Sequence, residues 1–175
     1  MTFMTFEYFW KNNEANFGSP IKKEVDGGTH ITFEIILKKG KEYIALRRMS
    51  NPGHESPPKI KEYPDGVLFF CHDLIRYGES IEQCVKRIVK DNSGVNVVKF
   101  KVVDIETTLM CESGGKPIKQ WAITPHIIAE VETLPKPGTY GNEIREVIKF
   151  TKNTIPDDFA WWSKKDLKEF LEKYD

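Results

Sequence analysis

Three neighbouring residues, Cys71, His72 and Asp73, carry side chains that could bind a metal ion or act as a nucleophile. Thiolate, imidazole and carboxylate groups all coordinate metals, and a thiolate assisted by a histidine attacks electrophiles. The residues follow the apolar run VLFFC, which predicts a short strand over 67–71. Along a strand, side chains alternate between faces, so residues 71 and 73 point one way and residue 72 points the other. The three side chains therefore do not converge, and the scattered remaining histidines and cysteines do not have the paired spacing of a zinc site.

A helix follows this strand and is the best-defined element of the sequence. Ser80 and Gln83 have the spacing of a capping box, in which each side chain bonds to the other residue's backbone N–H. Gly94 predicts the end of the helix, because glycine adopts the left-handed conformation at little cost. Apolar residues recur on one face at helical spacing, at Ile81, Cys84, Val85, Ile88 and Val89.

The other predicted elements are mostly strands and form a single α+β domain over residues 27–175. A second helix begins after Ser163, with Asp166 at capping-box spacing. An aromatic leader occupies residues 1–26, and we expect residues 1–17 to pack on the domain or to mediate a homodimer. The predicted strands cover residues 29–37 and 42–48 as a hairpin, then 67–71, 95–110, 120–132 and 143–151, with a long loop over 49–66.

The composition of the 175 residues excludes several classes of protein. With 39% hydrophobic and 30% charged residues, the chain is typical of a water-soluble globular domain. Lys plus Arg and Asp plus Glu are 26 each, and this balance disfavours binding to nucleic acid through phosphate neutralisation. Three irregularly spaced cysteines do not form a disulfide framework. No apolar run is long enough to cross a membrane and no signal peptide is evident, so we expect a cytoplasmic protein.

The order of these elements resembles that of the Nudix fold, and residues 78–97, GESIEQCVKRIVKDNSGVNV, resemble the Nudix box. The box has the pattern G-x5-E-x7-R-E-U-x-E-E-x-G-U, where U is an aliphatic residue. Glu79 and Arg87 match its first Glu and its Arg, and Val89, Gly94 and Val95 match its later positions. The resemblance, which covers roughly residues 29–174, implies an α/β/α sandwich with a mixed β-sheet, the box helix and a C-terminal helix.

The same resemblance implies a metal site that this chain has largely lost. In the family, three further glutamates of the box hold Mg²⁺ or Mn²⁺ against a diphosphate, and here those positions are Ile88, Asp91 and Asn92. Hard divalent cations need several anionic oxygen ligands. An isoleucine provides none and an asparagine provides only a neutral oxygen. We therefore expect a weak or absent Mg²⁺ or Mn²⁺ site at Asp91 and Asn92, to which Glu112 or Glu143 would add a loop carboxylate as family members do.

The charges along the helix support this expectation. Residues 80–92 contain two acidic residues and three basic ones, whereas the box of a hydrolase concentrates acid on this helix. The resemblance also implies phosphate contacts from basic residues near the end of the hairpin and beside the helix. The candidate ligand-binding residues are Arg47, Arg48, Arg76 and Arg87.

Two functions follow from this resemblance. The first is a Nudix-fold protein with a degenerate box that binds a nucleotide-like or phosphorylated small molecule, or a protein partner, without efficient hydrolysis. The alternative is a metal-dependent hydrolase of nucleoside diphosphate derivatives, in which Glu79 and Asp91 would be the catalytic residues of the box. Paired arginines at a strand end and surface carboxylates are also common without any function, so each candidate residue needs a place in the fold.

Overall fold

The computed structural model describes residues 28–49, 59–76, 78–113, 116–138 and 144–175. Within these residues, seven strands form one mixed sheet with the order β3-β2-β1-β6-β5, to which β4 and β7 add through β1 and β2. The strands are β1 (Gly28–Lys39), β2 (Glu42–Arg48), β3 (Val67–Phe69), β4 (Cys71–Leu74), β5 (Val97–Ser113), β6 (Lys116–Val131) and β7 (Ile144–Phe150), and the helices are α2 (Ile81–Ser93) and α3 (Lys164–Tyr174).

The predicted hairpin is confirmed, and its two strands separate soon after their turn. Gly40 has a positive φ of 61° in this turn, and β1 pairs with β2 only from Lys39↔Glu42 to Leu37↔Ile44. Farther from the turn, β3 pairs with β2 and β4 pairs with β1. The predicted strand over 67–71 is therefore two short strands with a break at Phe70.

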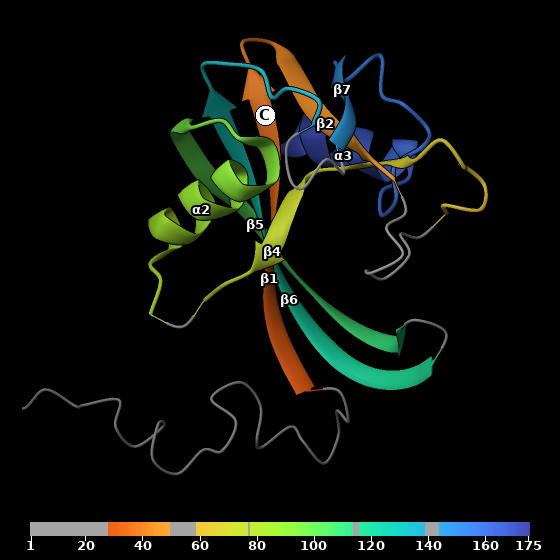
Figure 1. Cartoon of the computed structure of the whole chain (residues 1–175). Helices are drawn as coiled ribbons and strands as arrows, with labels where there is room; N and C mark the ends of the chain where they lie inside the picture. The colour runs from red at the N-terminus through yellow and green to blue at the C-terminus, as the bar shows by residue number, and fades with distance from the viewer. Residues whose placement is uncertain (1–27, 50–58, 77, 114–115, 139–143) are drawn as a thin grey trace, which may run out of the picture.

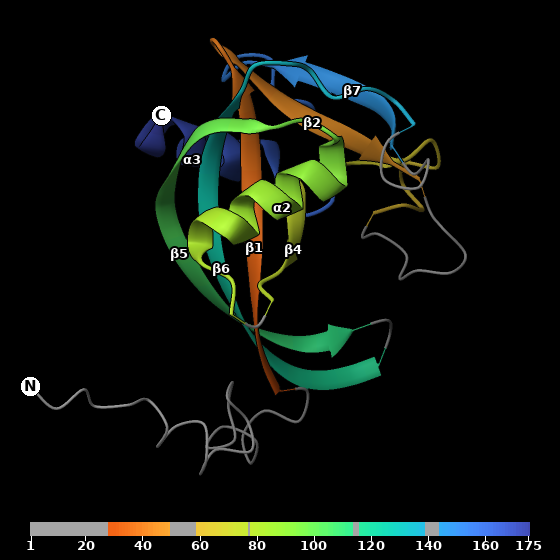
Figure 2. The same cartoon turned by 60° about the vertical axis from the view of Figure 1, so that its left-hand side comes forward.

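The two faces of the sheet support two separate cores, one under each helix. Figure 2 shows α2 in front of the sheet and α3 behind it, so the molecule has the three layers of an α/β/α sandwich (Figure 1). Because side chains alternate along β1, Phe33, Ile35 and Leu37 are buried on the α2 side, whereas Ile36 is buried on the α3 side. The predicted fold class is confirmed.

Both ends of α2 have the predicted caps. The Gln83 backbone N–H donates to Ser80 Oγ at 3.2 Å, and the Ser80 backbone N–H donates to Gln83 Oε1 at 2.8 Å. At the other end Gly94 adopts the left-handed conformation with φ 74°, and its N–H bonds to the Lys90 carbonyl. The apolar stripe of α2 faces the sheet, with Cys84, Val85, Ile88 and Val89 buried.

The C-terminal helix begins at the predicted cap, with one difference in detail. The Asp166 backbone N–H donates to Ser163 Oγ at 3.1 Å, as the spacing predicts. The Asp166 carboxylate accepts a bond from the Ser163 hydroxyl at 2.6 Å. In a capping box this carboxylate would instead accept from the Ser163 backbone N–H. The aromatic leader, residues 1–26, lies outside the described residues. No helix in the described part of the chain is long and apolar enough to cross a membrane.

Candidate functional site

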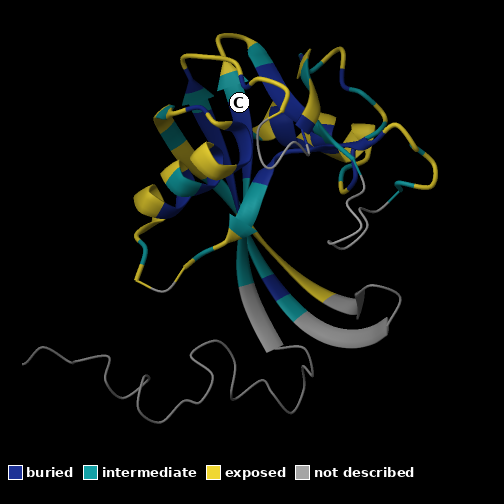
Figure 3. Ribbon diagram, viewed as in Figure 1, coloured by how far each residue is buried: buried dark blue, intermediate teal, exposed yellow. Residues whose placement is uncertain are grey.

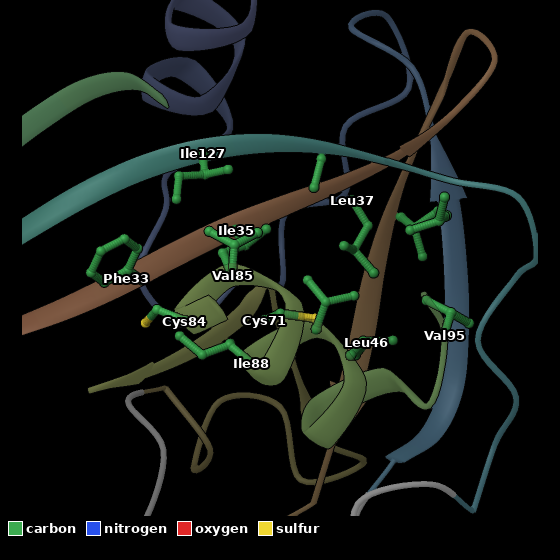
Figure 4. Close-up of a cluster of buried hydrophobic side chains, with 14 of the residues drawn as sticks. Phe33, Ile35, Leu37, Leu46, Cys71, Cys84, Val85, Ile88, Val95 and Ile127 are labelled. Atoms are coloured by element: carbon green, nitrogen blue, oxygen red, sulfur yellow. The ribbon is translucent and has the colours of Figure 1, made fainter. Parts of the chain in front are cut away.

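Ile88 lies in the core at the first position where the box would have a metal-binding glutamate. Its side chain is fully buried and belongs to the cluster between α2 and the sheet. Figure 4 shows it in this cluster with Cys71 and Leu46. The apolar stripe of α2 therefore includes this position, and a carboxylate there would be buried among hydrocarbon side chains. A charge in such surroundings is strongly unfavourable without a partner.

Asn92 occupies a second metal position of the box and has a structural role. Its residue exposure is 5%, and its Oδ1 accepts a hydrogen bond from the His72 backbone N–H at 3.2 Å. The interaction joins the last turn of α2 to β4 and satisfies the N–H of the second residue of that short strand. The amide oxygen that would face a metal is thus already bonded to the protein.

Glu79 and Arg87, the two best box matches, form an ion pair with each other. Arg87 Nε and Nη2 donate to the two oxygens of Glu79 at 2.5 and 2.8 Å, and Nη1 donates to Asp73 Oδ2 at 2.8 Å. Arg87 lowers the pKa of Glu79 to about 2 through these hydrogen bonds. The Glu79 carboxylate is therefore ionised and held by a guanidinium. Arg87 also has all three guanidinium nitrogens in contacts within the protein, including a bond to the Leu74 carbonyl.

Asp91 is the one acidic residue that remains at the three substituted metal positions. Its side chain is 45% exposed and lies 3.8 Å from Arg76 Nη2 and 4.0 Å from Arg87 Nη1. Two guanidinium groups so close to a carboxylate oppose the approach of a further cation. Asp91 thus belongs to the network of Arg76, Arg87, Asp73 and Glu79, which joins α2 to β4 and to the segment between them.

This donor set does not fit a divalent cation. Of the three box positions, one has no donor, one has a bonded amide and one faces two arginines. Among the described residues, no group of three Asp, Glu, His or Cys side chains is arranged to hold a metal. Of Glu112 only the backbone is described, on β5 opposite Pro117, and Glu143 lies outside the described residues.

Arg47 pairs with two carboxylates that are not part of the box. Its Nε donates to Glu146 Oε2 at 2.8 Å, its Nη1 bonds to Asp158, and the same Nη1 donates to the Gly66 carbonyl at 3.1 Å. These groups border an open pocket of about 600 Å³ that holds more carboxylates than arginines. Its lining is Arg47, Glu62, Tyr63, Pro64, Asp65, Gly66, Arg145, Glu146 and Asp158. An excess of negative charge does not favour a phosphate there.

Arg48 lies beside the stacked rings of Phe69 and His72. Its guanidinium is 5.1 Å from the centroid of the Phe69 ring, which stacks on His72 at 5.5 Å. Burial lowers the pKa of His72, so this imidazole is neutral near pH 7. The sequence suggested His72 only as a possible metal ligand, because its stacking on Phe69 depends on the break between β3 and β4.

The remaining candidates in this region are explained by the core. Cys71 is buried, and burial raises the pKa of its thiol to about 12, which rules out a thiolate nucleophile at neutral pH. Cys71 and Asp73 face α2 while His72 faces the other side, as their pairing with Ile35, Phe33 and Glu34 requires. The prediction that the three side chains do not converge is confirmed.

This arrangement of sheet and helices is the Nudix fold. A MutT NUDIX hydrolase from Burkholderia pseudomallei has a TM-score of 0.59 at 11% identity, over 83% of this chain and 97% of that one. A mutator MutT protein from Bacillus halodurans has a TM-score of 0.59 at 14% identity, over 81% of each chain. A pyrophosphohydrolase from Bacillus subtilis has a TM-score of 0.54 at 17% identity, over 81% of this chain and 78% of that one. No protein-family model and no curated protein matches the sequence.

Proposed function

We propose that this Nudix-fold protein binds a phosphorylated, nucleotide-like ligand without hydrolysing it. The observation that carries the proposal is the packing of α2, which buries Ile88 in the core and commits Asn92 to the backbone of β4. A diphosphate hydrolase of this fold would need carboxylates at these positions to hold a bridging metal. Binding of a phosphate needs only basic groups that pair with its oxygens, so it does not depend on those carboxylates.

The contacts of the candidate arginines distinguish Arg76 from Arg47 and Arg87. Arg47 and Arg87 each donate to two carboxylates within the protein. The Arg76 side chain is 64% exposed and lies 3.8 Å from the Asp91 carboxylate. We therefore assign a phosphate contact to Arg76, since guanidinium groups pair well with phosphate oxygens.

Calorimetric titration with nucleoside diphosphates, triphosphates and nucleotide sugars, in the presence of EDTA, tests this proposal. We expect binding by at least one of these compounds, weakened about tenfold by Arg76→Ala, which corresponds to about 1.4 kcal/mol. Lys86→Ala is the matched control, because Lys86 is an exposed cation of α2 that pairs with Glu82. No binding of any compound, or equal effects of the two variants, would contradict the proposal.

One observation favours the alternative, a metal-dependent hydrolase. The Asp91 carboxylate is about half exposed and its two ion pairs are long, so a substrate phosphate that drew the arginines away would free it. Under this alternative, Mg²⁺ or Mn²⁺ stimulates phosphate release and Asp91→Asn abolishes the stimulation. Glu82→Gln is the control carboxylate on the same helix. Metal-stimulated release that survives Asp91→Asn would exclude Asp91 from such a site.

A further inference from the structure

The face of the sheet that packs against α2 continues beyond this helix onto the outer halves of β5 and β6. On β6, Ile127 and Ala129 are in the core under α2, and alternation places Trp121 and Ile123 on the same side. The β5 partners of this side follow from the register, in which Leu109 lies opposite Trp121. We call this surface the outer apolar face and define it by its apolar residues Val102, Ile105, Leu109, Trp121 and Ile123. Thr107, opposite Ile123, is a polar residue on the same side.

The β5 part of the outer apolar face is exposed although its sequence pattern is that of a covered surface. Ile105, Leu109 and Val102 are 61%, 54% and 43% exposed, and Trp121 and Ile123 on β6 are half-buried. On β5 the opposite side of this stretch is polar, with Glu106 and Thr108. An antiparallel pair with one apolar and one polar face normally buries the apolar one. Figure 3 shows the exposed residues of β5 on the part of the sheet that extends away from the body.

The N-terminal segment enters the fold at the edge of this face. Residues 1–26 lead into β1, where Gly28 pairs with Gln120 and Thr29 pairs with Trp121. Eleven to twelve residues separate Phe17 from this point, and an extended chain of that length spans about 40 Å. The face from Leu109 to Val102 is about 24 Å long at the rise of a strand. The aromatic residues of the segment, Phe3, Phe6, Tyr8, Phe9, Trp10 and Phe17, are therefore within reach of the whole face.

We propose that the aromatic N-terminal segment of the same chain docks on the outer apolar face. Its aromatic side chains would cover the exposed Ile105, Leu109 and Val102. A tethered segment is also present at a local concentration in the millimolar range, which favours it over a second copy of the chain at micromolar concentration. The segment would thus cover the extension of β5 and β6 and join the N-terminus to the body of the domain.

Limited proteolysis of the full chain with chymotrypsin tests this docking, because the protease cleaves after the aromatic residues of the segment. Leu109→Lys and Thr108→Lys form a matched pair, since these exposed neighbours point to opposite faces of β5. We expect Leu109→Lys to accelerate cleavage within residues 1–26 by about tenfold or more, and Thr108→Lys to change it less than about twofold, because the cleavage rate follows the equilibrium population of the undocked segment. Ile105→Lys should reproduce the effect of Leu109→Lys.

Two measurements keep the result interpretable. Circular dichroism must show the same folded spectrum for each variant. In a full-length chain with Phe6, Phe9 and Trp10 changed to serine, the added Leu109→Lys change should have no further effect on thermal stability. Equal cleavage rates for the wild type, Leu109→Lys and Thr108→Lys would overturn the proposal. A wild-type dimer in sedimentation velocity that dissociates on Leu109→Lys would also overturn it, because a second copy would then cover the face.

Discussion

Arg87 shows, at the scale of single residues, that residues resembling the box have a structural role. Its side chain is 13% exposed and donates to Glu79, Asp73 and the Leu74 carbonyl. These bonds connect the segment before α2 to the helix itself. Arg87 and Glu79 therefore stabilise the start of α2.

Glu79 should make the stability of the protein depend on acid. Arg87 lowers its pKa from 4.5 to about 2, so the folded state holds the proton more weakly than the unfolded state. The stabilising contribution is complete above about pH 4.5 and is lost as the pH falls toward 2. Glu79→Gln should lower the free energy of unfolding at pH 6 but reduce its fall between pH 5 and pH 3, about where this carboxyl titrates.

Urea unfolding of the wild type and the variant at these pH values checks the expectation. Glu82→Gln is the control, because Lys86 also lowers the pKa of Glu82, but that pair is exposed to solvent. Exposed pairs of this kind contribute little, so this variant should retain the wild-type pH dependence. A Glu79→Gln curve parallel to that of the wild type would show that the Arg87 pair is not linked to folding.

At the scale of secondary structure, local signals predicted the elements and the hairpin of β1 and β2 and could not predict the distant strand partners. The helix from Ser80 to Gly94 followed from its caps and its apolar stripe, all of which are contained in fifteen residues. The parallel pairing of β1 with β6 joins segments about ninety residues apart, and no local pattern encodes it. The break at Phe70 has the same origin, because it depends on how far β1 and β2 separate.

The same limit applies to the candidate site. The substitutions at Ile88 and Asn92 were visible in the sequence, and the structure adds that both side chains are buried. Arg47 was a candidate for phosphate because its partners could not be read from the sequence: Glu146 and Asp158 are 99 and 111 residues away. A charged residue at a strand end can be identified locally, but whether it is already paired depends on the tertiary fold.

The N-terminal cap of α2 should contribute measurably to stability. Ser80→Ala removes the acceptor for the Gln83 backbone N–H and should lower the free energy of unfolding by about 1 kcal/mol. Ser80→Asp should restore most of this loss, since aspartate accepts the same bond and its charge interacts favourably with the helix N-terminus. Chemical denaturation of the three proteins measures the difference. Equal losses for both variants would mean that the cap bond does not determine the stability of α2.

At the scale of the whole molecule, α3 is fastened to the sheet near both of its ends. Trp162 Nε1 donates to Glu34 Oε1 at 3.0 Å just before the helix, and Glu34 also contacts the buried His126 at 3.1 Å. After the helix, Asp175 accepts a hydrogen bond from the Tyr43 hydroxyl at 2.6 Å and pairs with Lys38. These contacts reach β1, β2 and β6, so α3 closes the second core over the middle of the sheet.

Asp175→Ala should therefore loosen α3 from its C-terminal end. Loss of the bonds to Tyr43 and Lys38 should cost about 2 kcal/mol, because hydrogen bonds to a charged group are stronger than neutral ones. Native-state hydrogen exchange should then be faster in the last turns of α3, around Leu171, with little change in α2 on the other face. Glu172→Ala, which removes an exposed carboxylate paired with Lys168, is the matched control and should leave these amides unchanged. Uniformly faster exchange in both helices would instead mean that Asp175 stabilises the fold as a whole and does not hold α3 in particular.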